Sequence, residues 1–105
     1  MSQPAKSPYL SFAKGASAPC ILFRLEDKSQ LLLQYMHLSS MTLSPEQSLL
    51  CIHAGDEMQV QIEGAKLGPL FLTLQNFQIS LIQAGSLDDI VIKRVVLIRE
   101  SDIAP

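Results

Sequence analysis

The most constraining feature of this sequence is the strict alternation of apolar and polar side chains from Met58 to Glu63. Every second residue is apolar, which is the period of a β-strand that buries one face and exposes the other. Gly55 and Asp56, a turn-forming pair, separate this strand from the apolar run at residues 49–53. The sequence therefore predicts a β-hairpin, closed by a loop at residues 54–57.

The predicted hairpin decides the role of Cys51 and His53, the only cysteine and histidine close together in the chain. With the loop at residues 54–57, Cys51 faces Val60 and His53 faces Met58. Directly opposed residues share a face, so Cys51 is expected on the buried side. A register shift of one residue would move it to the other face.

A second hairpin is expected in residues 20–38, where two apolar runs flank the charged cluster at residues 26–29. If Asp27 and Lys28 form its tip, both faces of the strand pair are apolar. This tip pairs Phe23 with Leu32, and Leu22 with Leu33. Such a pair is either central to a sandwich or covered by another chain.

Three further elements follow. Pro45 suits a turn at residues 44–47 between strands at 41–43 and 49–53, although Ser44 and Gln47 could instead cap one short helical turn. An apolar stripe beginning at Leu67 predicts a helix over residues 67–76, with 77–83 extended. A hairpin turning at residues 75–76 is the alternative, but that turn lacks a glycine.

The last strand is expected at residues 90–98, which are rich in β-branched side chains. Lys93 and Arg94 interrupt this apolar run and indicate either a bulge or a strand end that reaches water.

Together these elements predict one α+β domain at residues 20–100, with an antiparallel sheet of about five strands and one helix packed on a face. The alternative is an all-β small barrel or sandwich. Residues 1–19 are expected to be a polar tail, flexible or extended, in which Tyr9, Leu10 and Phe12 could dock. Residues 101–105 are expected to be a frayed terminus.

Composition excludes several functions. The 105 residues have a formal net charge of -2 and only eight lysines and arginines, so a basic face for nucleic acid or an anionic membrane is not expected. Apolar residues make up 48% and charged residues only 17%, which favours burial of apolar surface between subunits. The absence of an apolar signal sequence and the two cysteines suggest a cytoplasmic protein with reduced thiols.

No residue pattern predicts a cofactor or a metal. Cys20, His37, Cys51 and His53 lack the spacing of zinc ligands, and Cys51 with His53 lacks a third group to orient the imidazole. The acidic pairs at 26–27, 56–57 and 88–89 adjoin expected turns, where carboxylates are solvated.

The leading hypothesis is therefore a non-enzymatic interaction or assembly domain that forms a homo-oligomer, most simply a dimer, or binds a protein partner. Its candidate interface consists of apolar residues left uncovered by the expected pairing: Leu31, Leu33, Leu50, Ile52, Leu72 and Ile79. The alternative is a small regulatory module that binds an apolar small molecule between sheet and helix. An enzyme based on Cys51 and His53 is a distant third.

Overall fold

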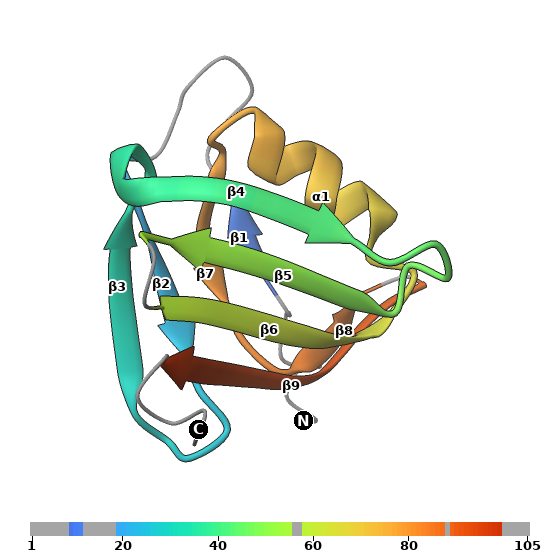
Figure 1. Cartoon of the computed structure of the whole chain (residues 1–105). Helices are drawn as coiled ribbons and strands as arrows, with labels where there is room; N and C mark the ends of the chain where they lie inside the picture. The colour runs from blue at the N-terminus through green and yellow to red at the C-terminus, as the bar shows by residue number, and fades with distance from the viewer. Residues whose placement is uncertain (1–8, 12–18, 56–57, 88, 100–105) are drawn as a thin grey trace, which may run out of the picture.

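The computed structural model describes residues 9–11, 19–55, 58–87 and 89–99 (Figure 1). Within these residues the chain forms two β-sheets and one α-helix, which confirms the predicted α+β class. The five-stranded antiparallel sheet was expected. The second sheet was not, because residues 20–24 and 30–34 had been assigned to the first sheet and residues 9–11 to the tail. The two sheets do not form a closed barrel.

The five-stranded sheet runs across the view of Figure 1. In spatial order its strands are β4 (Leu38–Leu43), β5 (Leu49–Ala54), β6 (Met58–Ala65), β9 (Ile90–Arg99) and β8 (Gly85–Leu87), all antiparallel. Its inner face has continuous apolar rows across neighbouring strands. One such row is Leu43, Leu50, Ile62 and Val95, and the next is Met41, Ile52, Val60 and Leu97.

The four-stranded sheet runs up and down the same view, behind and to the left of the first. In spatial order it consists of β1 (Tyr9–Ser11), β7 (Ile79–Ile82), β2 (Cys20–Arg24) and β3 (Gln30–Gln34). β2 and β7 are parallel, whereas the other pairs are antiparallel. A short 3-10 turn, η1 (Tyr35–His37), links β3 to β4 and so joins the two sheets.

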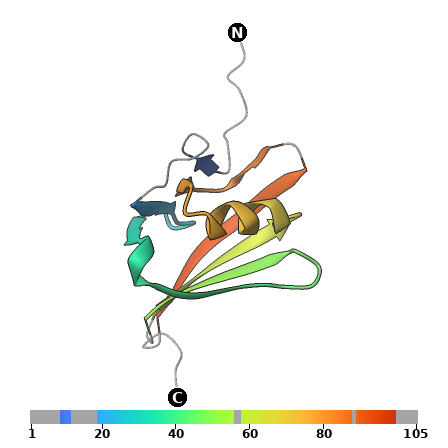
Figure 2. The ribbon, with the colours of Figure 1, turned by 90° about the horizontal axis from the view of Figure 1, so that it is seen from above.

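The helix α1 (Gly68–Gln75) confirms the helical reading of this region. Pro69 lies in its first turn, where a missing backbone N–H is tolerated. Leu70 and Leu74 are completely buried, and α1 lies across the upper end of the core (Figures 1 and 2). The extended segment expected at residues 77–83 is β7.

The register of the hairpin β5–β6 differs from the prediction by one residue. Ala54 pairs with Met58, so three residues rather than four separate the paired ends. Cys51 consequently faces Gln61, and His53 faces Gln59, on the outer face of the sheet. The prediction that Cys51 is a core residue is wrong, and Leu50 and Ile52 take the core positions instead.

The register of the hairpin β2–β3 also differs by one residue. Leu22 pairs with Leu32, and Ile21 and Phe23 pair with Leu33 and Leu31. The cause is a three-residue tip in which Lys28 adopts a φ of 77°. Such a tip combines an ordinary turn with one left-handed residue, usually glycine, so a lysine there gave no sequence signal.

Two other predictions, the turn at residues 44–47 and the bulge at Lys93, are confirmed. Residues 44–47 form a turn, with the Ser44 hydroxyl oxygen accepting hydrogen bonds from the backbone of Ser48 and Leu49. Lys93 forms a bulge, because Glu63 pairs with Arg94 and the next residue, Gly64, pairs with Ile92. In the N-terminal segment, residues 9–11 are extended and pair with β7. The expectations for Phe12, Asp56 and residues 101–105 concern positions outside the described residues.

Candidate functional site

Most of the residues expected at an interface lie inside the domain. Four are buried in the core, namely Leu33, Leu50, Ile52 and Ile79, and Leu31 packs partly against it. Only Leu72, on α1, is largely exposed, at 61% of its maximal area. The apolar surplus that suggested these residues as an interface is therefore mostly covered by the second sheet.

Cys51 and His53 lie two residues apart on the outer face of β5. Their directly paired neighbours are Thr42 and Gln61 for Cys51, and Ser40 and Gln59 for His53. Neither set contains a carboxylate to orient an imidazole. Within the described residues, no group of three or more histidines, cysteines and carboxylates is close enough to hold a metal ion.

Among the residues that the structure describes, the strand β3 is an edge of the four-stranded sheet, and its sequence is unusual for an edge. Its five residues, Gln-Leu-Leu-Leu-Gln, contain no charge and no proline. Edge strands of natural proteins are generally protected from further pairing by charges, prolines or bulges. β3 has none of these, and Leu32 points outward with 61% of its area exposed. Met36 follows in η1 and is 82% exposed.

The loop that joins β2 to β3 is held firmly against β9. The backbone N–H of Glu26 donates to the carbonyl of Val95 at 2.9 Å, and both carboxylate oxygens of Glu26 accept hydrogen bonds from Arg94, at 2.8 and 3.2 Å. Asp27 accepts hydrogen bonds from the backbone and the hydroxyl of Ser29. These contacts fix the position of Lys28 at the tip.

The same contacts change the acidity of the loop carboxylates. The hydrogen bonds from Arg94 lower the pKa of Glu26 below its ordinary value of 4.5, and those from Ser29 lower the pKa of Asp27 below 3.8. Arg94 also donates to Glu63 on the neighbouring strand at 3.1 Å. Arg94 is therefore neutralised by two carboxylates.

We expect Arg94→Gln to raise the pKa of Glu26 toward 4.5, because the charged hydrogen-bond donor is lost. Since folding lowers this pKa, the contribution of Glu26 to stability is present above pH 4.5 and is lost as the pH falls through the folded-state pKa. A carbon-detected NMR titration of the Glu26 carboxyl measures the shift. Lys93→Gln is the control, and an equal shift in both variants would contradict the assignment.

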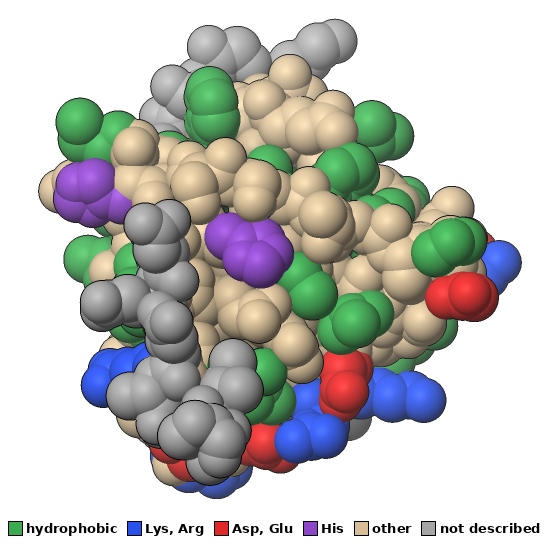
Figure 3. All heavy atoms as spheres, in the orientation of Figure 1, with side chains coloured by type: hydrophobic (Ala, Val, Ile, Leu, Met, Phe, Trp, Pro, Cys, Tyr) green, Lys and Arg blue, Asp and Glu red, His purple; other side chains and the backbone are tan. Residues whose placement is uncertain are grey.

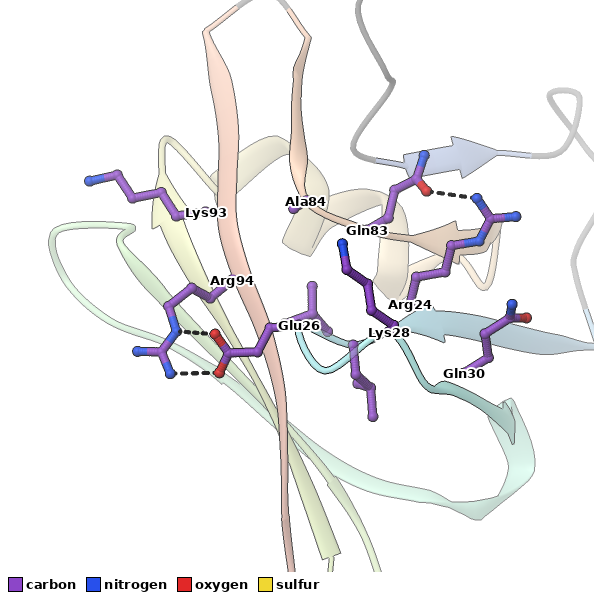
Figure 4. Close-up of a pocket in the computed structure, with 10 residues that line it drawn as sticks. Arg24, Glu26, Lys28, Gln30, Gln83, Ala84, Lys93 and Arg94 are labelled. Carbon is purple, nitrogen blue, oxygen red and sulfur yellow. Dashed lines mark hydrogen bonds and ion pairs between the residues drawn. The ribbon is translucent and has the colours of Figure 1, made fainter.

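A cleft of about 320 Å³ lies beside this loop, between β2 and β9 (Figure 4). Its charged lining consists of Arg24, Lys28, Lys93, Arg94 and Glu26, so half of the chain's eight lysines and arginines meet here. Gln30 and Gln83 add amide groups, and Leu25 and Val95 add apolar surface. A second cleft, of about 360 Å³, lies against the same loop and contains Glu26, Asp27 and Arg99.

Charge is unevenly distributed over the face of the molecule shown in Figure 3. In the view of Figure 3, lysine, arginine and acidic side chains gather along the lower edge and at the right-hand tip. The face above β4 and β5 consists mainly of uncharged side chains and the two histidines.

Sequence reasoning did not find the cationic cleft, because its charged residues are separated by up to 70 positions in the chain. Lys93 and Arg94 were recognised as a polar interruption of a strand, and Lys28 as a tip residue. What brings them together is the contact between the β2–β3 loop and β9.

Comparison of the chain with protein-family models, with curated proteins and with solved structures finds no match. Within the described residues, no helix is long and apolar enough to cross a membrane.

Proposed function

We propose that this domain is a non-enzymatic interaction module that forms a symmetric homodimer through the edge strand β3. The observation that supports this function is the sequence of that edge, Gln-Leu-Leu-Leu-Gln, which reads the same in both directions. An antiparallel pair of such strands centred on Leu32 places Leu32 opposite its own copy. Every glutamine then faces a glutamine, and every other leucine faces a leucine.

This arrangement satisfies the requirements of a two-fold interface. A dimer with one symmetry axis uses the same patch on both subunits, so the patch must be complementary to itself. The edge of β3 meets this condition without placing like charges opposite one another, which would be destabilising. Pairing would also supply partners for the backbone groups on the side of β3 that faces away from β2.

The side chains around the edge also favour a second copy of this chain as the partner. In the paired sheet, Leu31 would extend the inner apolar surface beside Leu33 of the second subunit. On the outer face, the two copies of Leu32 would contact each other next to Leu22, which is half-buried. The two exposed leucines thereby lose contact with water, which favours association.

The packing of α1 gives no comparable support to the small-molecule alternative. Leu67, Leu70 and Leu74 fill the contact between helix and core and are completely buried. The two clefts described above are lined by the β2–β3 loop and β9 rather than by the helix.

We expect the wild-type chain at micromolar concentration to have twice the monomer mass of 11.6 kDa in light scattering. Leu32→Lys should shift the chain to monomer, because it places a charge opposite an identical charge at the centre of the interface. Leu72→Lys is the matched control, since Leu72 is equally exposed but lies on α1. A monomeric wild type, or an equal effect of the two variants, would contradict the proposal.

A further inference from the structure

We propose that the cleft between the β2–β3 loop and β9 binds the phosphate group of a small phosphorylated molecule. This site adjoins the proposed dimer interface at Gln30, but it rests on different observations. The first is the imbalance of charge. Four cationic side chains line the cleft with a single carboxylate, although the whole chain has a net charge of -2.

Most of this positive charge is not neutralised by the protein. Arg94 is paired with Glu26 and Glu63, whereas Arg24 donates to the neutral amide oxygen of Gln83 at 3.0 Å. Lys28 and Lys93 form no ion pair within the described residues. Arg24 and Lys28 are therefore available on one side of the cleft, and two cations suit a group with about two negative charges, such as a phosphate monoester.

Two irregular backbone positions border the cleft. Lys28 has a φ of 77°, a left-handed conformation that glycine or asparagine would adopt more readily. Lys93 is the extra residue of a β-bulge, a device that redirects side chains and is common beside functional sites. These two irregularities, 65 residues apart in the chain, thus lie at the same cleft, and Lys28 extends on the side where Arg24 lies.

The arrangement in Figure 4 suits a phosphate group bound at one end of the cleft. Lys28 and Arg24 extend on the side of the cleft where Gln83 lies, whereas the Lys93 side chain extends away from them on the other side of β9. Arginine offers a planar pair of N–H donors that matches two phosphate oxygens, and lysine adds a point charge. The ion pair of Glu26 with Arg94 holds the loop in place, so the donors are positioned before the ligand arrives.

The size and surroundings of the cleft favour a small molecule over a nucleic acid. A volume of about 320 Å³ lies at the lower limit of small-molecule sites. It exceeds what one phosphate group needs, so there is room for an organic part beside Gln30 and Gln83. The carboxylates of Glu26, Glu63 and Asp27 nearby would repel further phosphates along a polynucleotide.

Inorganic pyrophosphate is the probe, titrated into the full chain at constant ionic strength and followed by amide NMR. We expect saturable shifts at the amides of Lys28, Lys93 and their neighbours. Lys28→Gly should weaken binding by about tenfold or more, because it removes one charge from the site. It should fold normally, because glycine adopts a positive φ without strain.

The matched control is Lys66→Gly. Lys66 also has a positive φ, of 57°, but it lies at the end of β6 and outside the cleft. Its substitution should leave the affinity for pyrophosphate unchanged. Shifts that do not saturate, or equal weakening by both variants, would overturn the proposal. Tighter binding of citrate than of pyrophosphate would overturn the phosphate assignment, and tighter binding of a short single-stranded DNA would overturn the small-molecule assignment.

Discussion

Gly64→Ala should destabilise the domain by about 3 kcal/mol or more, the largest single effect we expect. A Cβ atom on Gly64 would lie 1.8 Å from the carbonyl oxygen of Val91 and 2.8 Å from its carbonyl carbon. Both atoms belong to the backbone of β9, so no side-chain rotation can relieve the overlap. β6 and β9 would have to separate beside the Lys93 bulge, at the centre of the five-stranded sheet.

Urea denaturation measures the loss in the free energy of unfolding. Gly55→Ala is the matched control, because a Cβ atom there meets nothing within 4 Å and only the φ of 70° is unfavourable. We expect about 1 to 2 kcal/mol for this variant. If Gly64→Ala cost no more than Gly55→Ala, the close approach of the two strands would be wrong.

Tyr35→Phe should destabilise the domain by about 2 to 3 kcal/mol. The Tyr35 hydroxyl donates to the carbonyl of Ile79 at 2.7 Å and accepts from the backbone N–H of Ile79 at 3.0 Å. Ile79 is fully buried, so both hydrogen bonds form away from water. They connect η1, where the chain passes between the two sheets, to β7.

Urea denaturation again measures the effect, with Phe77→Leu as the control. Phe77 contacts the Tyr35 ring edge-on, with 5.1 Å between the centroids, but makes no hydrogen bond through its side chain. We expect about 1 kcal/mol or less for its loss. Equal effects of the two substitutions would show that the ring, and not the hydroxyl, stabilises this junction.

Burial also makes Tyr35 a source of pH dependence at high pH. Desolvation raises the pKa of Tyr35 from 10.0 to about 12. A group whose pKa is raised on folding contributes its full stability below the unfolded value of 10.0, and that contribution is lost as the pH rises toward 12. The wild-type chain should therefore lose stability in this range, and Tyr35→Phe should lose less.

Local patterns in the sequence predicted the elements but not their faces. The alternation at 58–63, the apolar stripe at 67–74 and the interruption at Lys93 correspond to β6, α1 and the bulge. Both hairpin registers were wrong by one residue, because each loop has an odd number of residues. A slip of one residue exchanges the faces, which is why Leu50 and Cys51 changed roles.

Long-range pairing explains what sequence reasoning missed. β2 and β7 are parallel and more than 50 residues apart, and no local signal reports such a pair. Without that pair, the apolar faces of β2 and β3 looked uncovered, and Leu31 and Leu33 were assigned to an interface. The structure covers Leu33 with its own core and leaves Leu32 exposed on the same strand.

The central claim is that two copies of β3 pair in antiparallel register about Leu32, and a cysteine at this position tests it most directly. Leu32→Cys is introduced into a chain in which the free cysteines Cys20 and Cys51 are replaced by serine. Opposed residues of antiparallel strands have Cα atoms about 4.5 to 5.5 Å apart, within reach of a disulfide. We predict rapid formation of a covalent dimer on mild oxidation, while Leu72→Cys in the same background stays monomeric. Cross-linking of Leu32→Cys no faster than that of Leu72→Cys would contradict the account.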